Sequence, residues 1–229
     1  MSGDFEAGVR ISPHDPGPNP AADSPPLARR RAAVAALGHE VRELVDAVVG
    51  TEVPAEDLER CVGEVRALTA RLRRRGRDRG ELASVDDLHA GVRMYNLVSG
   101  AGNPLSPPMR VELGDGTADA RGALGLAHEG PPSYGHGGVS ALLLDHVLGG
   151  AAAASGNPGM TVELAVRYRH PVPLRTPLLV RGATVDVDGR WIRANGSIAA
   201  AEAPDRALVT AEAKFVSLNP DQVRRLFPG

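Results

Sequence analysis

The sequence is poor in several residue types, and each shortage removes a class of protein. Its 229 residues include a single cysteine, Cys61, so an internal disulfide is impossible. Lysine occurs once, at Lys214, and the formal net charge is −2, which gives no reason to expect a nucleic-acid partner. No cluster of His, Cys and Asp shows the spacing of metal ligands, so neither a metal nor an organic cofactor is expected.

Long hydrophobic runs are also scarce. The longest extends over residues 139–154, is broken by Asp145 and His146, and is shorter than the roughly 20 residues that a membrane span requires. We therefore predict no transmembrane helix. No charged start followed by an apolar stretch marks a secretory signal, so a cytoplasmic location is the expectation.

The first hundred residues divide into a tail and a helical extension. Residues 1–27 are rich in Pro, Gly, Asp and Ser without apolar periodicity, which predicts a disordered tail. Residues 28–100 form the helical extension, in which apolar side chains recur at steps of three and four over 27–49 and again over 58–72. These two stripes predict a helical hairpin. A short third helix is expected over 84–98, capped by Ser84.

A run of six arginines follows the second stripe, between Arg71 and Arg79. This run could contact phosphate groups or a membrane. Alternatively, it is a solvated helix end, where the helix dipole favours cations. The solvated helix end is the preferred interpretation.

Beyond residue 108 the apolar period changes from 3.6 to 2, with one helical interruption. The pattern predicts a hairpin of 110–113 with 118–127, a helix over 137–154, and strands over 161–170, 178–187, 191–201 and 207–218. This is an α+β arrangement in which a curved antiparallel sheet wraps around one long central helix. In the strand 161–170 one face carries Val162, Leu164, Val166 and Tyr168, while the other carries Thr161, Glu163, Arg167 and Arg169.

The start of the central helix is the most informative feature. His136 precedes the pair Gly137-Gly138, and Asp145 follows nine residues after the histidine. Unpaired N–H groups at a helix start lie at the positive end of the dipole, so they can hold a carbonyl oxygen that is gaining negative charge. Asp145 is expected to face apolar neighbours, where a carboxylate is costly unless it is paired or functional.

These residues belong to a longer series of motifs. The series comprises Glu129-Gly130-Pro131-Pro132, His136-Gly137-Gly138, Asp145, Thr161, Tyr168 with Pro171 and Pro173, Gly189-Arg190, and the closing segment 215–220. In these motifs the chain resembles the hotdog-fold thioesterases, in particular the PaaI-like branch of the 4-hydroxybenzoyl-CoA thioesterase superfamily. The resemblance covers roughly residues 108–219 and assigns a hotdog thioesterase domain to 101–229. The helical hairpin lies outside it.

The resemblance implies hydrolysis of an acyl-CoA thioester at a site between two subunits of a dimer. Asp145 would be the catalytic carboxylate, as general base on water or as nucleophile, and the sequence leaves that choice open. The N–H of Gly137 would contact the oxyanion, and His136 would shape the turn. Thr161 of the partner subunit would position the water. A homodimer is the minimum assembly, and a dimer of dimers is a further possibility.

Further residues are candidates for substrate binding. Gly138 and Glu129 would line the site, and cations near its mouth would meet the CoA phosphates, since arginine suits bidentate phosphate contact. The candidate cations are Arg167, Arg169, Arg190 and Lys214. Two positions depart from the family pattern. Ser133 is at a position where glycine is more common, and Gly135 is at one where an apolar residue is more common.

Other interpretations stay open. The domain could bind acyl-CoA without turnover, as a sensor or scaffold with the hairpin as its interaction module. Asp145 could instead pair structurally with His146 or an arginine. A hotdog-fold hydratase is less favoured because no hydratase segment precedes the central helix, and a purely helical interaction protein would leave the second half unexplained. Chain length and type of the acyl group are not determined, although the scarcity of aromatics slightly favours aliphatic groups.

Overall fold

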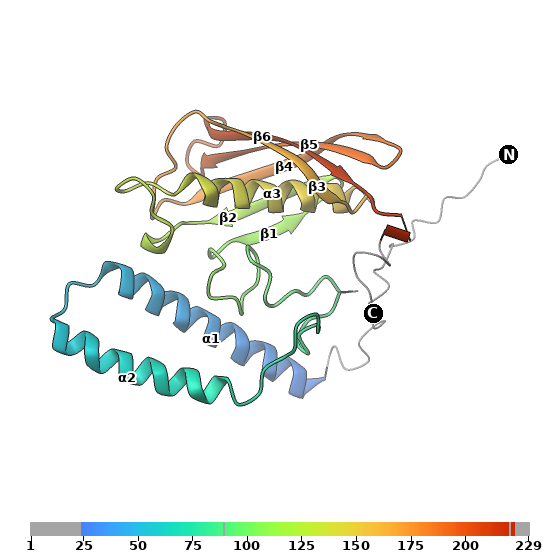
Figure 1. Cartoon of the computed structure of the whole chain (residues 1–229). Helices are drawn as coiled ribbons and strands as arrows, with labels where there is room; N and C mark the ends of the chain where they lie inside the picture. Colours follow the sequence, from blue (N-terminus) through green and yellow to red (C-terminus); the bar gives the residue numbers. More distant parts are fainter. Residues whose placement is uncertain (1–23, 89, 220, 223–229) are drawn as a thin grey trace.

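The two N-terminal helices form the predicted hairpin. The computed structural model describes residues 24–88, 90–219 and 221–222, and its first elements are α1 (Pro25–Gly50) and α2 (Ala55–Leu72) (Figure 1). Most of the predicted disordered tail lies outside the described residues. Its last three residues, 25–27, instead form the first turn of α1, where proline is tolerated because the N–H it lacks would be unpaired.

Helix α1 connects the hairpin to the rest of the molecule. The Arg42 guanidinium donates to the carbonyl oxygens of Ala101 (3.1 Å) and Asn103 (2.9 Å). Farther along α1, Asp46 Oδ1 accepts the N–H of Ala127 at 3.3 Å. Ala127 lies in the short 3-10 helix η1 (Leu126–His128). Helix α1 is thus held both by the connecting segment and by the residues that lead into the HGG motif.

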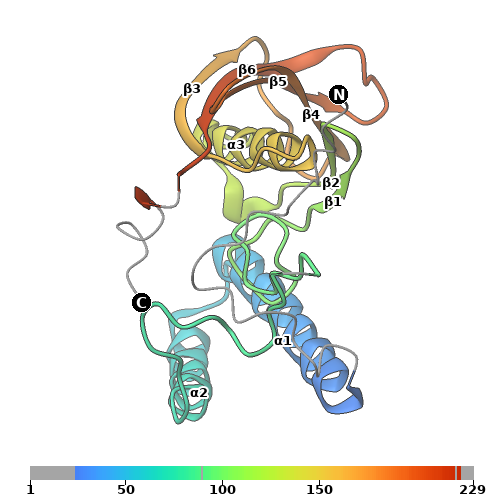
Figure 2. The ribbon, with the colours of Figure 1, turned by 90° about the vertical axis from the view of Figure 1, so that its right-hand side faces the viewer.

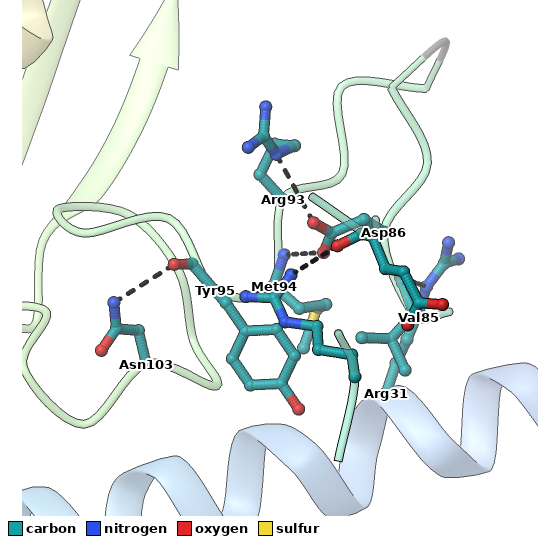
Figure 3. Close-up of polar contacts among 9 residues, drawn as sticks. Arg31, Val85, Asp86, Arg93, Met94, Tyr95 and Asn103 are labelled. Atoms are coloured by element: carbon teal, nitrogen blue, oxygen red, sulfur yellow. Dashed lines mark hydrogen bonds and ion pairs between the residues drawn. The ribbon is translucent and has the colours of Figure 1, made fainter. Parts of the chain in front are cut away.

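The third helix predicted over 84–98 is wrong, because the described residues of this segment form turns. Asp86 accepts the N–H of Met94 at 2.7 Å and pairs with Arg93 at 3.5 Å (Figure 3). Asp87 and Val92 exchange backbone hydrogen bonds, and Gly91 has a φ of +68°. Aspartate side chains that accept hydrogen bonds from nearby backbone groups compete with helix formation, and here they close turns. Helix α1 holds these turns in place, because Arg31 Nε donates to the carbonyl oxygen of Val85 at 2.8 Å.

The second half is a six-stranded antiparallel sheet wrapped around one helix. The sheet has the order β1-β2-β4-β5-β6-β3. Its elements are β1 (Arg110–Leu113), β2 (Thr117–Gly122), α3 (Gly137–Ala154), β3 (Met160–Tyr168), β4 (Leu178–Asp188), β5 (Trp191–Ala200) and β6 (Ala207–Val216). Figure 2 shows the sheet curving around α3. This confirms the predicted α+β architecture, and the one sizeable difference is that β2 ends at Gly122 rather than Ala127.

The core forms where α3 lies against the centre of the sheet. Leu143, Leu144, Val147 and Leu148 are fully buried. Gly182 of β4 and Gly196 of β5 are cross-strand partners, and a Cβ on them would lie 2.9 Å from Val147 Cγ1 and 3.0 Å from Leu148 Cδ2. This close approach of helix to sheet therefore requires glycine on both strands.

Helix α3 is long and apolar enough, by length and composition alone, to cross a membrane. In the structure it is the helix that the sheet encloses, with seven buried residues. A core helix passes the same test of length and composition, so this finding is no evidence for a span.

Candidate active site

The start of α3 has the geometry expected of an anion-binding helix terminus. His136 is the N-cap, and its Nδ1 accepts the N–H of Gly138 at 3.0 Å. Among the described residues, the N–H of Gly137 has no hydrogen-bond acceptor. His136 therefore caps this helix start and leaves one N–H unpaired at the positive end of the helix dipole, a position that favours anions.

Tyr168 covers this helix start, a role that the sequence analysis missed. Its hydroxyl donates to the carbonyl oxygen of Gly137 at 2.9 Å, and its ring carbon Cε1 lies 3.3 Å from the point where a Cβ on Gly137 would stand. Tyr168 is the last residue of β3 and remains exposed. The available signal was an aromatic residue at a strand end just before Pro171 and Pro173.

The loop before His136 explains one departure from the family pattern. Ser133 has a φ of +73°, the left-handed region that favours glycine and costs other residues about 1–2 kcal/mol. The Glu129 carboxylate accepts the N–H of Ser133 at 2.7 Å and so holds the loop in this conformation. At the other departure, Gly135, a Cβ would lie 2.8 Å from Leu124 Cδ1, so a larger residue would require that leucine to move.

Asp145 and Thr161 are hydrogen-bonded within one chain. Thr161 Oγ1 donates to Asp145 Oδ1 at 2.8 Å, and Asp145 is half-buried. The predicted placement of Thr161 on the same strand face as Glu163 is wrong. A register shift between Thr161 and Glu163 inserts Val162 as an extra residue, so Thr161 lies opposite Phe215, a core residue, and Glu163 opposite Lys214.

The two halves of the predicted machinery are too far apart to act within one chain. Gly137 and Asp145 are eight residues apart on the same helix, which separates them by about 12 Å along its axis. A general base must come within about 3 Å of the proton it removes, while the oxyanion donor contacts the same reacting carbonyl group. Within one chain, the fold therefore does not bring Gly137 and Asp145 to the same carbonyl group.

Two histidines near these residues have a lowered pKa. Burial lowers the pKa of His146 below 6.5, although the charge of neighbouring Asp145 opposes the shift. Burial also lowers the pKa of His128, against the opposing effects of its hydrogen bond from Gly125 and of the Asp46 charge. The His128 carbonyl accepts the N–H of His136 at 2.8 Å, which links η1 to the start of α3.

The predicted phosphate-binding cations differ in their surroundings. Arg167 pairs with Glu212 and Lys214 with Glu163, both at 2.6 Å. Arg190 donates to Gln222 Oε1 at 3.0 Å. The Arg169 guanidinium makes no hydrogen bond or ion pair with the described residues, and it directly follows Tyr168. Arg169 is therefore the cation of this group that is free to meet a ligand.

Two further features of the described residues bear on the site. No three His, Cys, Asp or Glu side chains gather where they could hold a metal ion. A hollow of about 690 Å³ lies between β1, β2, β4 and β5, and its lining residues include none of the predicted catalytic residues.

Known proteins match this chain mainly over the sheet and α3. A family model for the thioesterase superfamily matches residues 134–198. The acyl-coenzyme A thioesterase THEM4 of Mus musculus is 31% identical over 99 residues, which are 43% of this chain and 42% of that protein. The same enzyme of Xenopus laevis is 32% identical over 93 residues, 40% of this chain and 41% of that protein. The chain thus aligns with less than half the length of these curated relatives.

A solved structure extends the similarity farther. The crystal structure of a thioesterase superfamily protein is 37% identical, covers 80% of this chain and 94% of its own, and has a TM-score of 0.71. The span from β1 to β6 is about half of this chain, so this similarity also includes part of the helical extension. The chain belongs to the thioesterase superfamily and has its hotdog fold.

Proposed function

We propose that the protein hydrolyses acyl-CoA thioesters to the free acid and CoA, and that each active site is shared by two subunits. The observation that carries the proposal is the pair of half-sites on α3: an unpaired Gly137 N–H at the helix start, and Asp145 held by Thr161 two turns later. The curated relatives named as acyl-coenzyme A thioesterases support the same substrate class.

A two-fold dimer would complete the site. The edge strand β3 exposes the apolar side chains of Met160 and Val162, and its outer backbone edge is free to pair with the same strand of a second copy. Antiparallel pairing of two such edges would bring the two α3 helices alongside each other in opposite directions. Gly137 of the partner subunit would then approach Asp145, and the reverse would hold at a second, equivalent site.

The chemistry follows from these positions. The thioester carbonyl oxygen accepts the N–H of Gly137, which stabilises the negative charge that develops when a nucleophile attacks the carbonyl carbon. If Asp145 acts as general base, it takes a proton from the attacking water, and collapse of the tetrahedral intermediate breaks the C–S bond and releases the CoA thiolate, which is then protonated. If Asp145 is the nucleophile, its attack on the carbonyl carbon breaks the C–S bond, releases the CoA thiolate and forms an anhydride, which water then cleaves to the free acid and the Asp145 carboxylate.

The shared site also revises the predicted role of Thr161. Because Thr161 bonds Asp145 of its own chain, it would orient that carboxylate and the water beside it. What the other subunit supplies is the Gly137 end. Among the candidate cations, Arg169 is the preferred contact for the CoA phosphates, because Arg167 and Lys214 are already in ion pairs.

Steady-state hydrolysis tests the activity. A panel of acyl-CoAs from acetyl to palmitoyl, with benzoyl and phenylacetyl, is assayed by released thiol for the wild type, Asp145→Asn and the control Asp119→Asn on β2. We expect Asp145→Asn to lower kcat by at least about a hundredfold and the control to match the wild type. Binding of acyl-CoA without hydrolysis of any substrate would instead identify a sensor or scaffold.

Subunit complementation tests the shared site. Gly137→Pro removes the oxyanion N–H at a helix position where proline fits, and the extended backbone of His136 suits a following proline. Gly137→Pro and Asp145→Asn homodimers should both be nearly inactive. A heterodimer of the two, isolated with two affinity tags, has one intact shared site and should recover about half of the wild-type kcat. No recovery would place the whole site within one chain.

A further inference from the structure

Helix α2 presents an apolar stripe that nothing in the described chain covers. None of its 18 residues is buried, and Leu58, Val62, Val65 and Leu72 are exposed by 43%, 54%, 42% and 49%. Leu58, Val65 and Leu72 recur every seven residues, and Cys61 and Leu68 fall at the intermediate position. A repeat of this kind is the seam of a helix that packs lengthwise against another helix.

Helix α1 does not cover this stripe. Its inward face holds Gly38, Arg42 and Asp46 against the connecting segment and η1. Leu37, Leu44 and Val48 lie roughly 140° away around the helix and are exposed. Figure 2 shows α1 and α2 diverging from each other, and the apolar residues named above on both helices are exposed.

Charge divides the hairpin into two ends. Between Glu40 and Arg60, around the turn, the sequence has seven acidic residues and two arginines. Residues 27–39 and 61–79, at the open end, together have ten arginines and two acidic residues. Like charges therefore lie side by side within one hairpin at both ends, which opposes close packing of α1 on α2.

We propose that the α2 stripe binds the α2 stripe of a second copy of this chain, in antiparallel orientation about a two-fold axis near Val65. Reversal of one helix sets the acidic first turn of α2, with Glu56 and Asp57, against the basic last turn of the other, with Arg71 and Arg73. The same reversal covers both apolar seams along about 27 Å of helix. The surface is self-complementary, as a two-fold interface requires.

An anionic lipid surface fits the same stripe less well. A basic amphipathic helix that lies on a membrane has cations along its length. The first ten residues of α2 instead include Glu56, Asp57, Glu59 and Glu64, which an anionic surface would repel. The opposite charges at the two ends favour a reversed copy of the same helix.

Cysteine cross-linking tests the pairing and does not depend on enzymatic activity. In a Cys61→Ala background, Val65→Cys places a thiol near the two-fold axis, and the control Ala67→Cys places one about 200° around the helix. At low micromolar protein under mild oxidation, we expect at least about tenfold more disulfide-linked dimer from Val65→Cys than from the control. Equal cross-linking at the two positions would overturn the proposal.

Charge reversal then tests the antiparallel orientation in the Val65→Cys background. Variant A carries Glu56→Arg, Asp57→Arg and Glu59→Arg, and variant B carries Arg71→Glu, Arg73→Glu and Arg74→Glu. Each variant alone sets like charges together at both ends, so cross-linking should fall to the control level. An equimolar mixture of A and B sets opposite charges together at both ends and should restore it.

Three outcomes would contradict the pairing. Cross-linking of A or B alone at the wild-type level would show that the charges do not set the contact, and a mixture that fails to restore it would exclude the antiparallel orientation. Sedimentation of the wild type with phosphatidylserine vesicles, without specific cross-linking at residue 65, would show that the stripe docks on a membrane. Because no readout uses hydrolysis, these outcomes leave the proposed activity untouched.

Discussion

Helices α2 and α3 both have 18 residues but differ in how far they are buried. Helix α3 buries seven residues inside the curved sheet, whereas α2 buries none. The difference lies in composition around the helix: α3 is apolar nearly all round, and α2 has one apolar stripe on an otherwise charged surface. A helix that is apolar all round can only be stable when enclosed, but a one-sided stripe needs only one partner, which another chain can supply.

Different interactions also stabilise the two halves of the molecule. The sheet and α3 form one continuous hydrophobic core, while α1 attaches the hairpin through hydrogen bonds of Arg42 and Asp46 and through close packing of Gly38 against the connecting segment. Matched substitutions in the two regions can therefore measure how far the difference extends.

The largest expected difference concerns leucine. Leu148→Ala in α3 removes a fully buried side chain and should lower the free energy of unfolding by about 2–5 kcal/mol. Leu58→Ala in α2 should change it by less than about 0.5 kcal/mol at low protein concentration, because that side chain is already exposed. Urea unfolding measures both. Equal losses would show that the α2 stripe is covered within the chain.

Threonine gives the second comparison. Thr161→Val removes the hydrogen bond to Asp145 and should lower kcat about tenfold, equivalent to roughly 1.4 kcal/mol in the barrier. Thr69→Val in α2 should leave kcat unchanged. Steady-state kinetics of the two variants with one acyl-CoA provides the measurement. An unaltered kcat in Thr161→Val would remove this threonine from the mechanism.

The third comparison uses arginine substitutions to test how the hairpin is attached to the rest of the chain. Arg42→Ala removes two hydrogen bonds to backbone carbonyls and should weaken the α1 contact by about 1 kcal/mol, since the site is partly exposed. Hydrogen exchange in α1 should then accelerate by roughly fivefold while α3 keeps its protection. Arg66→Ala in α2, the matched control, should alter neither helix. Faster exchange in α3 as well would show that the two regions unfold together.

The smallest effect concerns pH. Since burial lowers the pKa of His146, the unfolded chain binds its proton more readily, and the stability contributed by the neutral side chain is lost as the pH falls below the ordinary value near 6.5. His146→Gln should therefore lose less free energy of unfolding between about pH 7.5 and pH 5.5 than the wild type does. His39→Gln, at an exposed position on α1, is the matched substitution, and urea unfolding at the two pH values measures all three proteins.

Local patterns in the sequence predicted most of the fold. The helix over 137–154 and the strands around it were correct to within two or three residues, except at the end of β2, because apolar period and turn residues are local signals. The third helix over 84–98 was wrong for a local reason: Asp86 and Asp87 bond nearby backbone groups and close turns.

The site was predicted in part. The pattern of His136, Gly137 and Asp145 placed them on one helix, and the structure agrees. Alternation put Thr161 on the wrong face, because a one-residue bulge reverses the side to which a strand residue points and leaves no mark in the apolar pattern. The contact of Tyr168 with Gly137 joins residues 31 positions apart, so no local pattern could show it.

The sequence by itself therefore determined which segments are helices and strands, which residues are apolar, and that a glycine pair opens a helix carrying a carboxylate. Only the tertiary structure decided that α3 is enclosed and α2 is not, that Thr161 meets Asp145, and that Gly137 and Asp145 are separated along one helix. Periodicity reports the side on which a residue lies within its own element. Which partner reaches that side depends on how the chain folds back and on whether a second chain is present.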